Sequence, residues 1–250
     1  MKIQILHIFI YPIVKYILFL KLSVAKKLVK VSFLTSYDEG AHDILFCEVL
    51  ENSLIKHANT IQHFKITKQP TTQILSYLIN LRGLELASDF YNEKWHCLEN
   101  LSTHFLQILR ARRVSIKPLA RLIENTSGYL TEFTINNEGG NTLNNRIIIQ
   151  AICKNLKYLK LSLRSANILE LEKLLINCQY LEGLYILKID AIDWGNLFEI
   201  LAKSSPSSLF KFKFCFSCTK VEIESLKLFF DNWKIDIQCY YILYRFFNLV

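Results

Sequence analysis

Two cysteines are the residues whose spacing first suggests chemistry. Cys215 and Cys218 form a lone Cys-x-x-Cys pair directly after an apolar run that is typical of a strand. A zinc site needs about four nitrogen or sulfur ligands around the metal, and the neighbouring sequence offers no second cysteine pair or histidine. A redox pair needs a thiolate stabilised at a helix start, whereas Cys215 follows a predicted strand. We therefore expect neither a metal nor a cofactor.

The other groups that could act in catalysis do not form a familiar catalytic pattern. The histidines include no His-Glu-x-x-His pair, and His96 and Cys97 are adjacent, so their side chains diverge. The loop at 137–141 has two glycines but lacks the Lys-Ser/Thr of a phosphate-binding loop. Glu170 and Glu172 belong to a predicted helix face that water should cover. The sequence therefore predicts a protein that is not an enzyme.

A short pattern, Leu-x-x-Leu-x-Leu with other apolar residues allowed, recurs along the chain. Its successive starting positions are separated by 33, 20, 25, 24, 26, 25 and 28 residues. Leucine-rich repeats have periods of roughly 20–29 residues, and only the first interval lies outside that range. The copies are Leu28-Val31-Phe33, Ile61-Phe64-Ile66, Leu81-Leu84-Leu86, Leu106-Leu109-Ala111, Leu130-Phe133-Ile135, Leu156-Leu159-Leu161, Leu181-Leu184-Ile186 and Leu209-Phe212-Phe214.

The segments between these patterns have helical spacing. In residues 171–181 an apolar stripe with helical period includes Cys178, which we interpret as a small, inert core residue. Pro118 suits a first helical turn, Asp193 is a plausible N-cap and Pro206 a helix stop. The sequence thus predicts an α/β fold: a curved leucine-rich-repeat solenoid with one helix and one short parallel strand per repeat.

Composition is compatible with this fold and suggests a cellular compartment. Hydrophobic residues make up 51% of the 250 residues and charged residues 21%, with only 7 glycines and 4 prolines. The 7 cysteines are scattered without a disulfide framework, so we expect reduced thiols in the cytoplasm or nucleus. We predict an apolar segment of uncertain role at 1–21, the repeat domain at 22–234 and an apolar tail at 235–250.

The first 25 residues leave a second interpretation open. They are apolar, and Ser23-Val24-Ala25 resembles a cleavage site, so the protein could be a secreted or membrane-anchored repeat protein. Lys15 and Lys21 interrupt the apolar run and Pro12 would kink a spanning helix, which favours a buried first element over a membrane segment.

Phrases within the repeats resemble a known family. "LLINCQYLEGLYI", "LIENTSGYLTEFTI" and "SLIKHANTIQHFKI" are similar to the cysteine-containing repeats of F-box/leucine-rich-repeat proteins. "LFEILAKSSPSSLFKFKF" and "ESLKLFFDNWK" resemble an expanded fungal family of F-box-like proteins. The resemblance covers roughly residues 22–234 and implies a substrate receptor of a Skp–cullin–F-box ubiquitin ligase. Two departures are clear: residues 1–21 show no F-box for the Skp-type adaptor, and the consensus Asn or Cys after each strand is mostly replaced.

The strand positions that should face away from the core are rich in cations. Side chains alternate along a strand, so the third, fifth and seventh positions should form the concave face. These positions hold seven Lys/Arg and two acids, against 30 and 22 in the whole chain. We hypothesise a basic, partly aromatic groove for an acidic segment of a partner protein; the competing interpretation is a solvated face without a ligand. The sequence favours neither nucleic acid nor a membrane as partner. The candidate residues are Lys30, His63, Lys65, Arg110, Arg112, Tyr158, Lys160, Tyr185, Lys211 and Lys213.

Overall fold

A computed structural model describes ten stretches of the chain, and they fall into two compact units. The described residues are 4–10, 28–35, 41–88, 94–126, 128–136, 155–163, 167–189, 193–216, 223–232 and 240–245. The N-terminal unit comprises Met1–Tyr129 and the C-terminal unit Leu130–Val250. Each unit is described by itself below.

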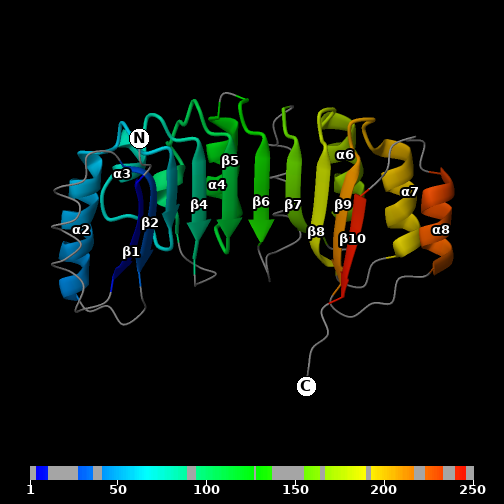
Figure 1. Ribbon diagram of the computed structural model, residues 1–250, viewed down its shortest axis with the longest axis horizontal. Helices are drawn as coiled ribbons and strands as arrows, with labels where there is room; N and C mark the ends of the chain where they lie inside the picture. Colours follow the sequence, from blue (N-terminus) through cyan, green and yellow to red (C-terminus); the bar gives the residue numbers. More distant parts are fainter. Residues whose placement is uncertain are drawn as a thin grey trace, which may run out of the picture. The chain divides into compact units, whose positions relative to one another are not determined.

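The N-terminal unit contains a run of parallel strands that pair in chain order, each with the next (Figure 1). Its strands are β1 (Gln4–Ile10), β2 (Leu28–Thr35), β3 (His63–Ile66), β4 (Gly83–Ala87) and β5 (Ile108–Arg112). Its helices are α2 (Ala41–Ile55), the single-turn α3 (Ile74–Tyr77), the 3-10 helix η1 (His96–Leu98) and α4 (Ile116–Glu124).

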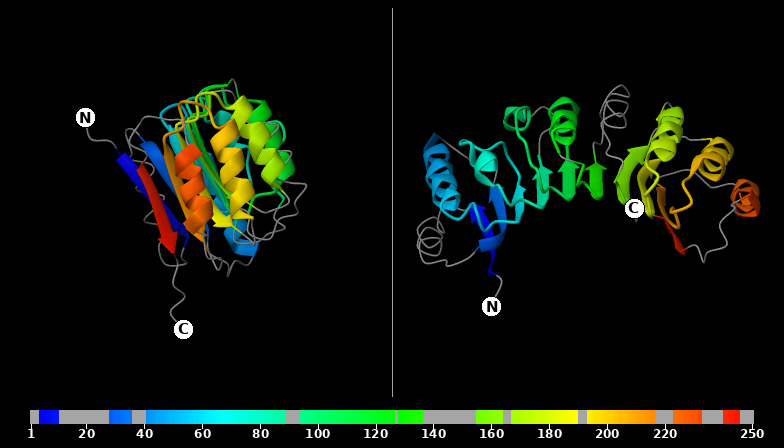
Figure 2. Two further views of the ribbon diagram at one scale, coloured as in Figure 1. Left: turned by 90° about the vertical axis from the view of Figure 1, so that its right-hand side faces the viewer. Right: turned by 90° about the horizontal axis from the view of Figure 1, so that it is seen from above.

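The C-terminal unit repeats the same arrangement, and its described helices have 10 or 11 residues each. Its strands are β6 (Glu132–Asn136), β7 (Tyr158–Leu163), β8 (Gly183–Ile189), β9 (Lys211–Phe216) and β10 (Tyr240–Arg245), again parallel and paired in chain order. Its helices are α6 (Ile168–Asn177), α7 (Trp194–Ser204) and α8 (Ile223–Asn232). In both units the described helices lie on one side of the strands (Figure 2).

The core lies between the strands and these helices, where the recurring pattern predicts it. All three apolar positions of each of the eight sequence patterns are buried, with exposed fractions of 7% or less. They lie in register: Phe64 on β3 pairs with Leu84 on β4, and Leu159 on β7 pairs with Leu184 on β8. A single repeat of one strand and one helix cannot bury its apolar face alone, so neighbouring repeats complete the core. The predicted α/β repeat solenoid is confirmed; its predicted curvature stays a prediction.

The predicted helix boundaries are also confirmed. The Asp193 side chain caps α7 by accepting a hydrogen bond from the backbone N–H of Asn196, at 3.3 Å. This helix ends at Ser204, two residues before Pro206. Pro118 occupies the first turn of α4, where its missing N–H has no helical partner to lose. Cys178, at the C-terminal end of α6, is 1% exposed, as expected for a core residue.

The sheet extends beyond the predicted limits of the repeat domain. β1 lies within the segment 1–21 and pairs with β2, and β10 lies within the tail 235–250 and pairs with β9. β1 carries the Leu-x-x-Leu-x-Leu spacing as Ile3-Leu6-Ile8, a copy that the predicted domain limits left out, and its Leu6 and Ile8 pair with Val31 and Phe33 of β2. β10 lacks the spacing in the register that pairs with β9, because its sequence has Gln238 at the first position. Residues 11–27, which include the Ser23-Val24-Ala25 stretch, are outside the described residues, and so is Cys218. Within the stretches described, no helix is long and apolar enough to span a membrane.

Candidate binding face

The strand face opposite the described helices, here called the open face, carries the candidate residues. In the N-terminal unit the strand register aligns them in two rows. The first row runs from Lys30 through His63 and Gly83 to Ile108, and the second runs from Ser32 through Lys65 and Glu85 to Arg110. Arg112 follows two residues after Arg110 on β5 and so points to the same face.

Charged groups on the N-terminal open face interact across strands. The Lys65 ammonium and the Glu85 carboxylate on the next strand form an ion pair of 2.5 Å, in which both side chains are about one-third exposed. Lys30, Arg110 and Arg112 are exposed. Ser32, which alternation also places on this face, is buried at 3% exposure. The described side chains therefore leave this part of the face positively charged.

His63 lies directly over Gly83 on the neighbouring strand. A Cβ atom on Gly83 would clash with the ring nitrogen Nδ1 of His63, so only glycine leaves room for the ring in this position. Burial is the main cause that lowers the pKa of His63 below its ordinary value of 6.5, and the charges of Lys30, Arg110 and Arg82 lower it further. The imidazole is thus held among cations that oppose its protonation.

The C-terminal open face has the same two-row construction with tyrosines in it. One row runs from Glu132 through Tyr158 and Gly183 to Lys211; the other has Thr134, Lys160, Tyr185 and Lys213 side by side. The Tyr158 ring lies over Gly183, where a Cβ atom would approach its Cδ1 to 2.8 Å. The Lys211 ammonium lies 6.0 Å from the centre of the Tyr185 ring, a distance at which a cation and an aromatic face attract each other.

A shallow depression of about 300 Å³ opens on this face. It is lined by residues 132–134 of β6, residues 158–160 of β7 and Tyr185 of β8. Phe133 and Leu159 are fully buried and form the floor, while the Lys160 side chain is exposed. The depression therefore combines an apolar floor and two tyrosine side chains with one lysine, Lys160.

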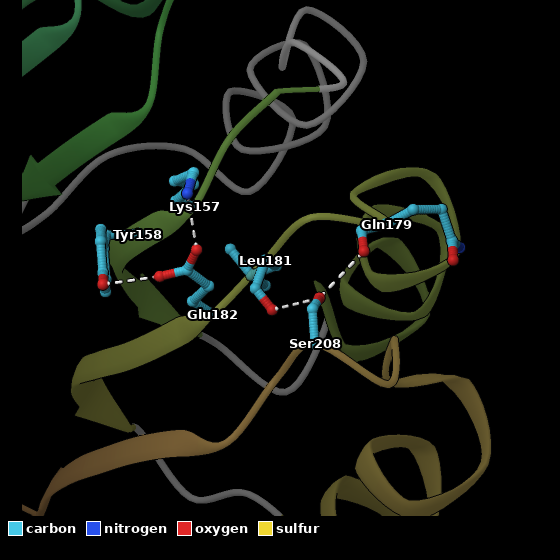
Figure 3. A network of polar contacts seen from close by, with 6 residues as sticks. All are labelled: Lys157, Tyr158, Gln179, Leu181, Glu182 and Ser208. Atoms are coloured by element: carbon cyan, nitrogen blue, oxygen red, sulfur yellow. Dashed lines mark hydrogen bonds and ion pairs between the residues drawn. The ribbon is translucent and has the colours of Figure 1, made fainter.

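A polar network holds one wall of the depression in place (Figure 3). The Tyr158 hydroxyl donates a hydrogen bond to Oε2 of Glu182 at 2.7 Å, and the Lys157 ammonium pairs with Oε1 of the same carboxylate at 2.8 Å. Because the neutral hydroxyl donates to a carboxylate, the pKa of Tyr158 is raised above its ordinary value of 10.0. The hydrogen bonds from Lys157 and Tyr158 in turn lower the pKa of Glu182 below 4.5.

The turn beside this network is fixed by the next repeat. The Ser208 hydroxyl lies within hydrogen-bond distance of the backbone carbonyls of Gln179 and Leu181, at 2.9 and 2.8 Å (Figure 3). The backbone carbonyl of Glu182 accepts hydrogen bonds from the N–H groups of Phe210 and Lys211. Glu182 is therefore anchored through both its side chain and its backbone.

The structure brings the predicted residues together in two groups. Lys30, His63, Lys65, Arg110 and Arg112 share the open face of the N-terminal unit; the group in the C-terminal unit consists of Tyr158, Lys160, Tyr185, Lys211 and Lys213. Sequence reasoning missed Glu182 and Lys157, because both precede a strand instead of lying in it. Gly83 and Gly183, at the third position of their patterns, could have predicted that the aromatic ring at the same position of the preceding strand packs over them.

The described stretches contain no group of three or more His, Cys, Asp or Glu side chains that could hold a metal ion. Cys47, Cys97 and Cys178 form no disulfide there. The described open faces therefore carry charged side chains, aromatic rings and a depression that could contact a partner.

Comparisons with known proteins identify the fold alone. No family model matches this chain, and no curated protein matches it. A solved structure of a protein from Bacteroides fragilis, determined by the Northeast Structural Genomics Consortium, is similar over 86% of this chain and 67% of that chain, with a TM-score of 0.52 and 12% sequence identity. Similarity at that identity supports the architecture and carries no information about function.

Proposed function

We propose that this protein is a non-catalytic protein–protein recognition module whose open faces bind an acidic segment of a partner protein. The observation that carries the proposal is the strand register, which aligns cations on the face opposite the helices. In the N-terminal unit four Lys/Arg side chains lie there with Glu85, and in the C-terminal unit three lysines lie there with Glu132. An excess of positive charge on a strand face attracts and orients a segment of negative charge.

The proposal includes the leucine-rich-repeat assignment and the F-box-like resemblance. In that family the repeats hold the substrate of a ubiquitin ligase, and the open faces of the repeats serve the same purpose here. The scattered cysteines favour a cytoplasmic or nuclear site of action. Binding of a Skp-type adaptor is a separate question, since residues 1–21 carry no F-box pattern.

The test uses the intact chain and a defined probe. A fluorescent peptide of alternating Glu and Gly should bind with an affinity that falls as salt is added, and the matching Gln-Gly peptide should not bind. Reversing three cations on the open faces (Arg110→Glu, Arg112→Glu, Lys160→Glu) should weaken binding by about tenfold or more.

A matched triple variant separates this face from net charge. Lys117, Lys173 and Lys227 are exposed on α4, α6 and α8, so their reversal to Glu changes the total charge equally on the helix side. We expect this control to retain most of the affinity. Equal losses in both triple variants would contradict the proposal, because binding would then follow net charge alone.

A second experiment addresses the ligase link. Purified Skp-type adaptor would be passed over the immobilised intact chain, with a complete F-box protein as positive control. Retention would support a receptor within a ligase, whereas its absence beside peptide binding would identify a stand-alone binder.

A further inference from the structure

The depression on the C-terminal open face has the volume, the aromatic rim and the apolar floor of a binding pocket. Its volume of about 300 Å³ is at the small end of ligand pockets, which span roughly 300–1,000 Å³. Two tyrosine rings stand at its edge, and its floor is formed by Phe133 and Leu159. A site of this size suits one side chain of a partner better than a whole small molecule.

One wall of the depression is held in place before any ligand arrives. The Tyr158 ring lies against Gly183, its hydroxyl is hydrogen-bonded to Glu182, and Glu182 is paired with Lys157. The backbone of Glu182 is bonded in both directions, through its N–H to the carbonyl of Lys157 and through its own carbonyl to the next repeat. Ordering a side chain on binding costs free energy, and a ring that is already fixed avoids that cost.

Charge on the surrounding strands selects the kind of segment that could enter. Lys160 and Lys213 flank Tyr185 in one row, and Lys211 follows Gly183 in the other. Glu132 is the one acidic side chain among the described lining residues of the depression. The Glu182 carboxylate already has two partners, so it contributes little free negative charge. An apolar side chain flanked by carboxylates is complementary to this arrangement.

From this geometry we infer that the depression is the anchor pocket of the binding face: it takes one apolar side chain of an acidic partner segment, and Lys160, Lys211 and Lys213 pair with the carboxylates beside it. The inference rests on the proposed function and adds a sequence requirement to it. A purely acidic segment would bind through charge alone, whereas the preferred segment has one apolar residue among its acids.

The experiment compares two peptides on the intact chain. Both alternate Glu and Gly, and one has a single central Leu in place of Gly. Burying an apolar side chain in the depression should make the Leu peptide bind about tenfold tighter to the unchanged protein. Tyr158→Ala, which removes the wall, and Gly183→Ala, whose Cβ would displace the Tyr158 ring, should both reduce this preference to about twofold or less.

Two further variants keep the test independent of folding defects. Gly83→Ala makes the same change under His63 in the N-terminal unit, outside the depression, and should leave the preference for the Leu peptide intact. Tyr158→Phe retains the ring without the hydroxyl and should keep more than half of the preference. Circular dichroism on every variant shows whether the fold is retained.

The outcomes separate the inference from the proposed function. Equal binding of both peptides to the unchanged protein, or a preference that survives in Tyr158→Ala, would overturn the anchor pocket while salt-dependent binding keeps the proposed function. Failure of both peptides to bind would overturn the two together. A preference lost in Tyr158→Ala and kept in Gly83→Ala and Tyr158→Phe would establish the pocket.

Discussion

The Tyr158 hydroxyl and the Glu182 carboxylate are joined by a 2.7 Å hydrogen bond that crosses from one repeat to the next. Tyr158 begins β7 and Glu182 directly precedes β8, so the bond links the N-terminal ends of two neighbouring strands. Lys157, the residue before Tyr158, forms an ion pair with the same Glu182 carboxylate. A repeat architecture depends on such contacts between neighbours, because each repeat is too small to be stable alone.

Removing the hydroxyl should therefore weaken the contact between these repeats. Tyr158→Phe should lower the free energy of unfolding by about 1 kcal/mol, since it loses a half-buried hydrogen bond to a charged acceptor but keeps the ring. Urea unfolding measures the change. Tyr180→Phe is the control, because Tyr180 is 61% exposed and its substitution should change stability by less than about 0.5 kcal/mol. Equal stability of Tyr158→Phe and the unchanged protein would mean that the bond is not maintained in solution.

The same contact should be visible in the pH dependence of stability. The pKa of Tyr158 is raised in the folded chain by its hydrogen bond to Glu182, so its contribution is fully present below pH 10.0 and is lost as the pH rises through the raised value. The pKa of Glu182 is lowered, so its contribution is present above pH 4.5 and is lost as the pH falls through the lowered value. Comparing unfolding curves of the unchanged protein and Glu182→Gln should show both losses only in the former.

His63 should make the N-terminal unit sensitive to mild acid. The pKa of His63 is lowered by burial and by the nearby cations, so as the pH falls the unfolded chain is protonated at a higher pH than the folded chain. The free energy of unfolding should therefore decrease as the pH falls from 6.5 toward the lowered pKa and then level off. His63→Gln should remove this decrease, whereas His104→Gln, an exposed control, should not. A proton NMR titration of the His63 ring should show a pKa that rises in Lys30→Met.

Glu51 on α2 is a buried carboxylate that we expect to hold the turn at Thr71 and Thr72, just before α3. It is 1% exposed and accepts hydrogen bonds from the backbone N–H groups of Thr71 and Thr72, at 3.0 and 2.6 Å, and from the Thr72 hydroxyl at 2.6 Å. Glu51→Ala leaves these donors without an acceptor and should cost about 3 kcal/mol of stability. Glu48→Ala, at an exposed position of the same helix, should cost less than about 0.5 kcal/mol in the same unfolding experiment.

The thiols should differ in reactivity according to burial. Cys178 is 1% exposed and Cys47 is 5% exposed, whereas Cys97 in η1 is partly exposed. In variants that keep a single cysteine, a thiol reagent should label Cys97 rapidly and Cys178 only at the rate at which its repeat opens. Fast labelling of Cys178 under native conditions would contradict its assignment as an inert core residue.

Much of the fold could be predicted because the same apolar spacing recurs at similar intervals, and each copy supports the assignment of the others. One Leu-x-x-Leu-x-Leu segment means little, but the register of Leu84 with Phe64 and Leu109 follows from several copies with similar spacing. Alternation along each strand then predicted that Lys30, Lys65 and Arg110 avoid the core, since burial of unpaired charge is prohibitively costly. β1 was predictable in the same way, since Ile3, Leu6 and Ile8 have the spacing of the other copies. β10 was not, because Gln238 stands where the pattern requires its first apolar residue.

The amino-acid sequence by itself determined which side chains form the core and which form the open face, because a period of two residues assigns every strand position to a side. Only the tertiary structure decided which of those side chains meet. The rings of His63 and Tyr158 lie over Gly83 and Gly183 because parallel pairing sets glycine beside each ring. The carboxylate of Glu182 reaches Tyr158 across a sequence separation of 24 residues, a contact that strand register and turn geometry create together.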